Sequence, residues 1–147
     1  MEAPAVADLI VANAAAELIN DCNNCLRLTW LSGPRNFDDF RLVMNVLLQA
    51  CRRQGTGKVL VDQRNMATLS PAEESWIAED WLPRSVVQGN YRYAAVLPPT
   101  DPEALACMKA LKWPPVPEAP QFATFADEAT ALGWLRRQVP VASRHLV

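Results

Sequence analysis

The chain of 147 residues has no marked excess of charge and contains few histidines, glycines and cysteines. Its 14 basic and 16 acidic side chains give a net charge of −2. This argues against a general binder of nucleic acid or of anionic membranes, since both need a cationic face. The apolar stretch from Ala3 to Ile19 is interrupted by polar residues and has no basic segment before it. We therefore expect no membrane span and no signal peptide, and a cytoplasmic location.

Residue types that commonly carry catalysis are scarce or poorly placed. The one histidine, His145, lies beyond Pro140 in the C-terminal segment, so a catalytic pair would have to recruit that tail. Ser70 is not flanked by the glycines of a nucleophile elbow. Gly55-Thr56-Gly57 lacks the Lys-Ser/Thr sequel of a phosphate-binding loop. We expect no enzymatic activity and no cofactor.

The four cysteines include a Cys-x-x-Cys motif, Cys22-Asn23-Asn24-Cys25. A thiol redox site needs this motif at the start of a helix, whereas here it precedes an alternating strand and spans a predicted hairpin turn. A zinc site would need a second pair, and Cys51 and Cys107 stand far apart. We interpret the cysteines as free thiols and expect no metal; a redox role for Cys22 and Cys25 is the alternative left open.

Half of the residues are apolar and 20% are charged, as in an ordinary globular protein. The length predicts a single domain over 1–147, with a core of about 5–139 and a short C-terminal tail, 140–147. The first half predicts a β-meander and then a helix, in the following segments: strands at 5–11, 18–22 and 26–31, and a helix from Phe37 that Asn36 or Asp38 caps and Gly55 ends.

The stretch from Lys58 to Glu73 is the most informative part of the chain. Lys58 to Val61 is an apolar run typical of a strand buried on both faces. Ser70 as N-cap, Pro71 and Glu73 then mark the start of a helix. The loop between them lies where open α/β sheets bind their ligands.

Asp62 and Arg64 follow the buried strand directly. They could contact a ligand, or Asp62 could cap loop amides while Arg64 pairs with a carboxylate. Trp81 and Trp113 stand near proline residues, and they could anchor a partner, line an apolar pocket or fill the core. Pro83 is expected to end or kink the helix that Ser70 starts.

The second half alternates strands and helices. The predicted segments are a strand at Tyr91–Leu97, a helix starting at Thr100–Glu103, an extended connector at Trp113–Pro117, a strand at Gln121–Phe125 and a helix that Asp127 caps. This order predicts an α/β fold with a mixed sheet, a β-meander start and helices packed on the sheet. Lys58 to Val61 should be its central strand, parallel to Tyr91–Leu97.

Several motifs together resemble those of a known family. They are Leu-x-Leu-x-Trp at 26–30, Val-Leu-Val-Asp-x-Arg at 59–64, Leu-Ser-Pro-Ala-Glu at 69–73, Trp-x-x-x-x-Trp-Leu-Pro-Arg at 76–84 and Phe-x-Asp-x-x-x-Ala-x-x-Trp-Leu at 125–135. In order and spacing the chain is similar to the bacterial SpoIIAA-like, or STAS/SEC14-type, small domains over about residues 25–138. The resemblance implies the fold of the anti-sigma-factor antagonists.

The resemblance also implies binding to a protein partner, controlled in the true antagonists by a phosphorylatable serine at the start of the helix after the buried strand. Here Ala72 falls roughly at that position, and Glu73 and Glu74 would repel a phosphate. The standard phosphorylation switch is therefore not expected.

Two functions follow as expectations. The first is a non-enzymatic regulatory or scaffolding module that binds an unknown protein partner. Its contact surface would be the loop 63–69 and the helix 70–84, with binding residues Asp62, Arg64, Ser70, Trp81 and Arg84. The alternative, suggested by SEC14-like relatives, is a carrier or sensor of a small apolar, lipid-like ligand held between sheet and helices. A dry pocket of about 300 Å³ or more would favour the alternative. A homodimer is also left open.

Overall fold

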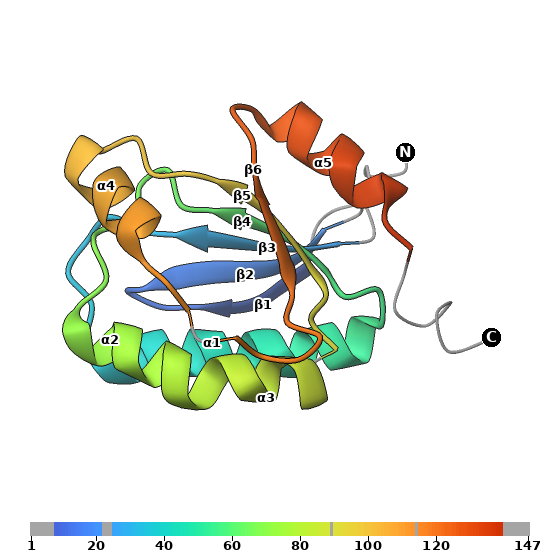
Figure 1. Cartoon of the computed structure of the whole chain (residues 1–147), viewed down its shortest axis with the longest axis horizontal. Helices are drawn as coiled ribbons and strands as arrows, with labels where there is room; N and C mark the ends of the chain where they lie inside the picture. The colour runs from blue at the N-terminus through green and yellow to red at the C-terminus, as the bar shows by residue number, and fades with distance from the viewer. Residues whose placement is uncertain (1–7, 22–24, 89, 114, 140–147) are drawn as a thin grey trace, which may run out of the picture.

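A computed structural model of the chain describes residues 8–21, 25–88, 90–113 and 115–139. Its centre is a six-stranded sheet with helices on both faces (Figure 1). The strands are β1 (Asp8–Ala12), β2 (Ala16–Asp21), β3 (Cys25–Trp30), β4 (Lys58–Asp62), β5 (Tyr93–Leu97) and β6 (Gln121–Thr124). They lie side by side in the order of the sequence.

The sheet is antiparallel in its first part and parallel in its second. β1, β2 and β3 pair antiparallel, whereas β3, β4, β5 and β6 pair parallel. β4 is central, between β3 and β5, and Val59 and Val61 are both buried. The predicted mixed α/β fold and its central strand are confirmed. The predicted turn at 23–24 and residues 5–7 of the first predicted strand lie outside the described residues.

Helix α1 (Phe37–Gln54) connects β3 to β4 and covers one face of the sheet. Its N-cap is Asn36, whose side chain accepts a hydrogen bond from the Asp39 amide. Gly55 ends the helix with a positive φ of 87°, a conformation that suits glycine because it has no Cβ. The sequence had left Asn36 and Asp38 as alternative caps, and the structure decides for Asn36.

The next helical segment runs past the proline that was expected to end or kink it. It consists of α2 (Pro71–Trp76), a π-helical turn (Ile77–Trp81) and α3 (Leu82–Val87). In the wider turn the Leu82 amide donates to the Ile77 carbonyl, five residues back. In a regular α-helix the Pro83 ring would clash with the carbonyl four residues earlier. The π turn lies just before Pro83, where the hydrogen-bonding pattern changes from four to five residues. The helical segment therefore continues to Val87, and ending at Pro83 is wrong.

Alternating side chains of the strands enter two separate cores. Val59 and Val61 of β4 pack on the face that carries α1 and the run α2–α3, whereas Leu60 packs on the opposite face. On that opposite face lies α5 (Glu128–Arg137), which Asp127 caps as predicted. Helix α4 (Pro102–Ala110) follows β5, and its Met108 packs against the core of the α1 face.

Candidate functional site

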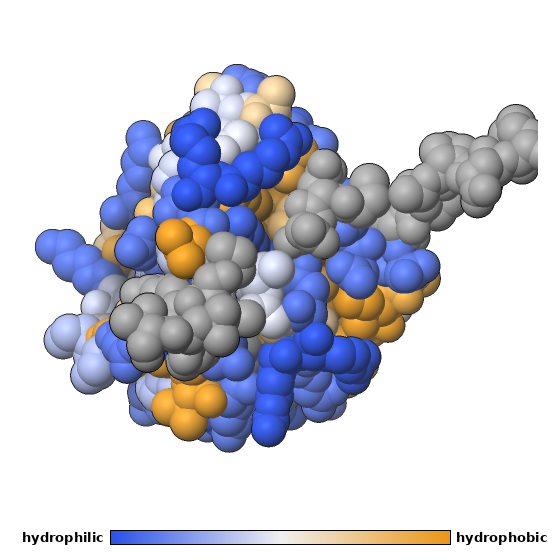
Figure 2. Space-filling model, turned by 90° about the vertical axis from the view of Figure 1, so that its right-hand side faces the viewer, coloured by the Kyte–Doolittle hydropathy of each residue, from blue (hydrophilic) through white to orange (hydrophobic). Residues whose placement is uncertain are grey.

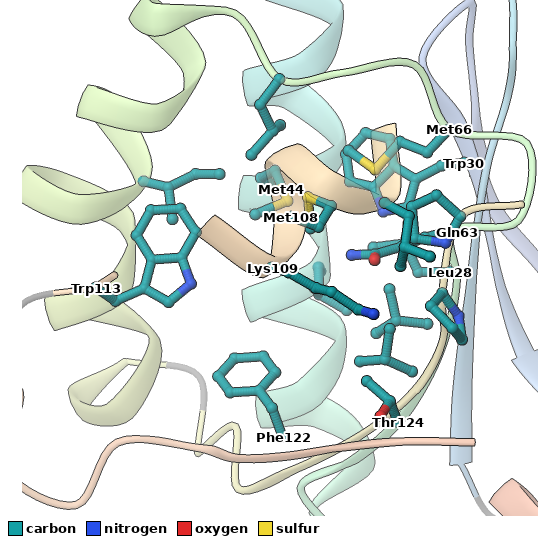
Figure 3. A pocket seen from close by; sticks show the side chains of 18 of the residues that line it. Leu28, Trp30, Met44, Gln63, Met66, Met108, Lys109, Trp113, Phe122 and Thr124 are labelled. Atoms are coloured by element: carbon teal, nitrogen blue, oxygen red, sulfur yellow. The ribbon is translucent and has the colours of Figure 1, made fainter. Parts of the chain in front are cut away.

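A cavity of about 610 Å³ lies between the sheet and the helices on the α1 face. It is lined by side chains from all of the parallel strands, from α1, the π turn and α4, and from the segment after α4 (Figure 3). Its walls are mainly apolar: Leu28, Trp30, Phe40, Met44, Leu47, Val61, Met66, Leu69, Ile77, Trp81, Leu82, Tyr91, Val96, Leu105, Met108, Trp113, Phe122 and Phe125, with Pro98, Pro99 and Ala126. The remaining lining residues are Gln63, Lys109 and Thr124.

Strand alternation explains why these residues share one space. Leu28 and Trp30 are two residues apart on β3, and Phe122 and Thr124 are two apart on β6, so each pair points to the same face. Gln63 follows Val61 by two positions, just beyond the end of β4. The carboxyl ends of parallel strands are where ligands of α/β sheets bind.

Aromatic rings hold two walls of the cavity in place. Trp30 stacks on Phe40 of α1 with ring centroids 5.2 Å apart. Trp81 meets Tyr91 edge to face at 5.7 Å. Both contacts are within the range in which aromatic pairs attract each other. These walls are therefore formed by rings that pack on one another.

Exposure divides the cavity into a closed end and a mouth. Phe40, Leu47 and Leu28 are buried at the closed end. Lys109, Thr124 and Phe122 are exposed, with Phe122 at 51%. The mouth therefore lies between α4 and β6.

Trp81, which the sequence placed on an outer contact surface, is only 3% exposed. It lies in the wall of the cavity, where its indole Nε1 donates a 2.8 Å hydrogen bond to the Met44 carbonyl of α1. The outer contact position is therefore wrong, and Trp81 takes the pocket-lining role that the sequence also left open for it. Trp113 also lines the cavity, which is one of the roles that the sequence left open for it.

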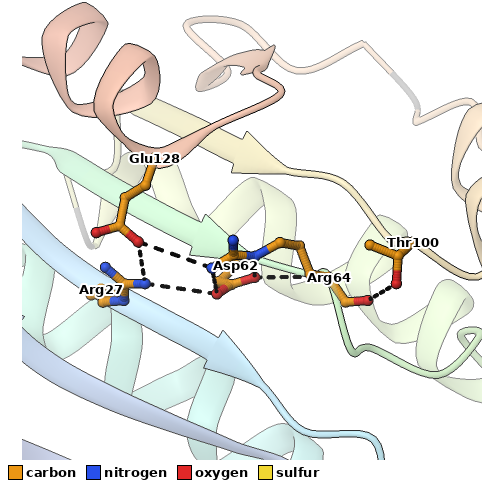
Figure 4. A network of polar contacts seen from close by, with 5 residues as sticks. All are labelled: Arg27, Asp62, Arg64, Thr100 and Glu128. Carbon is orange, nitrogen blue, oxygen red and sulfur yellow. Dashed lines mark hydrogen bonds and ion pairs between the residues drawn. The ribbon is translucent and has the colours of Figure 1, made fainter.

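Asp62 and Arg64 lie together on the other side of the sheet, facing α5 (Figure 4). Arg64 donates to both carboxylate oxygens of Asp62, at 3.0 and 2.8 Å. Arg27 of β3 lies 3.7 Å from Asp62 and donates to Glu128 of α5 at 2.7 Å. The four charges balance, and the network connects β3 and β4 to the start of α5.

The network also holds its carboxylates in the ionised form. Burial of Asp62 opposes its ionisation, but the hydrogen bonds from Arg64 and the charge of Arg27 outweigh burial and lower the pKa of Asp62. The hydrogen bond from Arg27 lowers the pKa of Glu128. Asp62 therefore acts within this chain as an ionised partner of two arginines.

Ser70 is the N-cap that the sequence predicted. Its hydroxyl oxygen accepts from the Glu73 amide at 3.1 Å, and the Glu73 carboxylate accepts from the Ser70 amide at 2.9 Å. The same carboxylate accepts two hydrogen bonds from Arg35, at 2.8 and 2.7 Å. The side chains of Arg35 and Glu73 are each 6% exposed. Burial opposes ionisation of Glu73, but the Arg35 and Ser70 hydrogen bonds lower its pKa overall.

Arg84 is half-buried on the helical run, where it contacts α1 and not the other predicted site residues. It pairs with Asp80 at 2.7 Å, donates to Asn45 of α1 at 2.9 Å and stacks over the Trp76 ring. The five predicted residues thus do not form one site: Asp62 and Arg64 meet, and the other three lie in three different contacts. The sequence named Gln63 only as the start of the loop 63–69 and did not single out Lys109 or Thr124, because their place beside the cavity depends on how α4 and β6 lie on the sheet.

The cysteines, the acidic groups and the surface offer no competing site in the described ranges. Cys25 and Cys51 are buried and Cys107 is exposed, while Cys22 and His145 lie outside these ranges. Burial raises the pKa of Cys51 to about 12, which keeps this thiol protonated. No group of three potential metal ligands occurs among residues 8–21, 25–88, 90–113 and 115–139, nor is any helix there long and apolar enough to cross a bilayer. On the face shown in Figure 2, hydrophobic side chains form separate patches within a largely hydrophilic surface.

No protein-family model, curated protein or solved structure matches the chain.

Proposed function

We propose that this protein binds a small apolar molecule in the cavity on the α1 face and acts as its carrier or sensor. The observation that carries the proposal is the cavity itself, which has a volume of about 610 Å³ and largely apolar walls. Pockets for small ligands occupy roughly 300–1,000 Å³ and combine apolar walls with a few polar groups. The cavity of this chain has both properties.

The walls support the proposal because they combine rigid and adaptable parts. The stacked rings of Trp30 and Phe40 are fixed by their contact. Met44, Met66 and Met108 are unbranched and can adjust to the outline of a bound molecule. The π turn that carries Trp81 is a feature often found at functional sites.

Binding of a protein partner, the first expectation from the sequence, is supported less well. Its proposed anchor Trp81 is buried, and Asp62, Arg64 and Arg84 are paired within the chain. Ser70 is engaged as a helix cap. We therefore propose ligand binding as the main function. A protein partner is the second candidate, and it would respond to the ligand-bound form.

The test uses N-phenyl-1-naphthylamine, an uncharged probe that fluoresces in apolar pockets. Leu28→Trp should abolish its binding, because Leu28 points into the cavity from the centre of the sheet. The matched control is Leu42→Trp on α1, where Leu42 is 49% exposed and does not line the cavity. Met108→Trp, at a half-buried lining position, is a second blocking variant.

We expect saturable binding to the natural chain and to Leu42→Trp, and a loss of at least tenfold in affinity in the blocked variants. Circular dichroism and urea unfolding confirm that each variant is folded. No binding to the natural chain, or equal binding to folded Leu28→Trp and Met108→Trp, would contradict the proposal.

A further inference from the structure

Three polar side chains of the described residues, other than that of the buried Tyr91, line the cavity, and they include a cation but no anion. Lys109, in the last turn of α4, is exposed and lines the cavity. Thr124 at the end of β6 is exposed too, and Gln63 just after β4 is half-buried. No aspartate or glutamate lines the cavity within the part of the chain that the structure describes. The mouth therefore offers a cation and neutral hydrogen-bonding groups, with no acidic counterpart.

These three side chains also have free hydrogen-bonding capacity. Among the described residues, Lys109 forms no ion pair, a property it shares with Lys112 and several other basic residues; what distinguishes Lys109 is that it lines the cavity. The side chains of Gln63 and Thr124 have no hydrogen-bond partner within the same described part of the chain. In Figure 3 the Lys109 side chain extends across the cavity, with its ammonium group directed toward the part that Gln63 and Thr124 line.

Parallel strand geometry places the two neutral groups around that ammonium. β4 and β6 flank β5 and all three strands run in the same direction. Their carboxyl ends therefore lie at the same edge of the sheet, with Thr124 level with Val61 across β5 and Gln63 two residues further along the chain. A head group paired with the Lys109 ammonium would have the amide on one side of it and the hydroxyl on the other (Figure 3).

We propose that the ligand is an anionic amphiphile: an apolar chain or ring system that ends in one negatively charged group. The apolar part would enter first and fill the closed end around Phe40, Leu47 and Leu28. The charged group would stay at the mouth, where Lys109 pairs with it and water still reaches it. A cationic amphiphile would be repelled at the same point, and a neutral one would leave the ammonium without a partner. This inference rests on the proposed function, since it names the class of molecule that the cavity holds.

The test compares three compounds with the same twelve-carbon chain: dodecanoate, dodecyl phosphate and 1-dodecanol. Displacement of N-phenyl-1-naphthylamine from the full-length chain is measured for each compound at low salt, with the two anions below their micellar concentrations and dodecanol below its solubility limit. Lys109→Gln removes the cation and keeps a polar side chain of similar reach. The matched control is Lys112→Gln, because Lys112 is exposed, lies three residues away and does not line the cavity.

We expect at least one of the two anions to bind about threefold to tenfold more tightly than dodecanol, as for an ion pair that is partly open to solvent. Lys109→Gln should remove this preference without weakening dodecanol, and Lys112→Gln should retain it. Higher salt should reduce the preference in the natural chain. Comparison of dodecanoate with dodecyl phosphate shows whether a carboxylate or a phosphate is the better head group.

Two failures can be told apart. If dodecanol binds as tightly as both anions, or if the two lysine variants behave alike, the anionic head group is wrong while the apolar cavity site stands. If the probe binds in the cavity but none of the three compounds displaces it, this inference alone is wrong. If the probe itself does not bind, both this inference and the proposed function are wrong.

Discussion

The indole nitrogen of Trp81 donates a 2.8 Å hydrogen bond to the main-chain carbonyl of Met44, and this bond joins two walls of the cavity. Trp81 belongs to the π turn and Met44 to α1. The bond therefore fixes the helical run against its neighbouring helix at the closed end of the cavity.

Trp81→Phe should lower the free energy of unfolding by about 1–2 kcal/mol, because it removes this bond and part of the ring. Trp81→Ala should cost about 3–5 kcal/mol, as for other buried aromatic residues. Urea unfolding followed by circular dichroism measures both values. If Trp81→Ala cost less than about 0.5 kcal/mol, the ring would be a surface side chain, and its position in the wall would be incorrect.

Ser70→Ala should lower the free energy of unfolding by about 1 kcal/mol, because it removes the side-chain cap of α2. Probe binding should be unchanged, since Ser70 does not line the cavity. Ser70→Thr, which retains a hydroxyl, is the matched control. A loss of binding in folded Ser70→Ala would show a functional role beyond the cap.

Acid should destabilise the protein through carboxylates whose pKa the fold lowers. Glu73, Asp62 and Glu128 all have a lowered pKa in the folded chain. Their stabilising effect is therefore complete above the ordinary carboxyl values of 3.8 to 4.5, and it is lost as the pH falls through the folded values.

Glu73→Gln removes one of these groups and leaves Arg35 buried without its carboxylate. We expect it to cost about 3 kcal/mol at neutral pH, and to lose less stability than the natural chain between pH 5 and about pH 3. Urea midpoints measured across this range give both results, with Glu103→Gln on the exposed side of α4 as control. A parallel loss of stability with pH in the natural chain and Glu73→Gln would contradict the assigned role of Glu73.

Asp62→Asn should lower the free energy of unfolding by about 1–2 kcal/mol and leave probe binding intact. Its carboxylate pairs with Arg64 and Arg27 on the face opposite the cavity, so the loss concerns the attachment of α5. Unfolding and probe titration of the same sample separate the two effects. A folded variant with weaker probe binding would indicate that Asp62 belongs to the ligand site after all.

The local elements could be predicted because their signals are local. Ser70, Pro71 and Glu73 form a capping box in adjacent backbone positions, and Gly55 ends a helix through its own φ. The apolar run of β4 requires burial on both faces, which only a central strand provides. These features depend on a few neighbouring residues and are therefore readable from the sequence.

The cavity could not be predicted in the same way, because an empty volume depends on how distant elements sit on one another. Lys109 is an ordinary lysine in the last turn of a helix until α4 is placed over the end of the sheet. Trp81 could not be assigned for a related reason. Its residue type suits a protein interface, a pocket wall and a core equally, and only the packing of the helical run on α1 decides between them.

The most direct test of the cavity as a ligand site is NMR of the methionine methyl groups. Three of the chain's four methionines, Met44, Met66 and Met108, line the cavity. Single Met→Leu substitutions assign the signals, and dodecanoate and N-phenyl-1-naphthylamine are then added in turn. We expect the three assigned signals to shift with saturation and to show contacts with the bound compound, and we expect both effects to disappear in Leu28→Trp. Saturable binding that leaves all three methyl signals unmoved would contradict the account, because the compound would then lie outside the cavity.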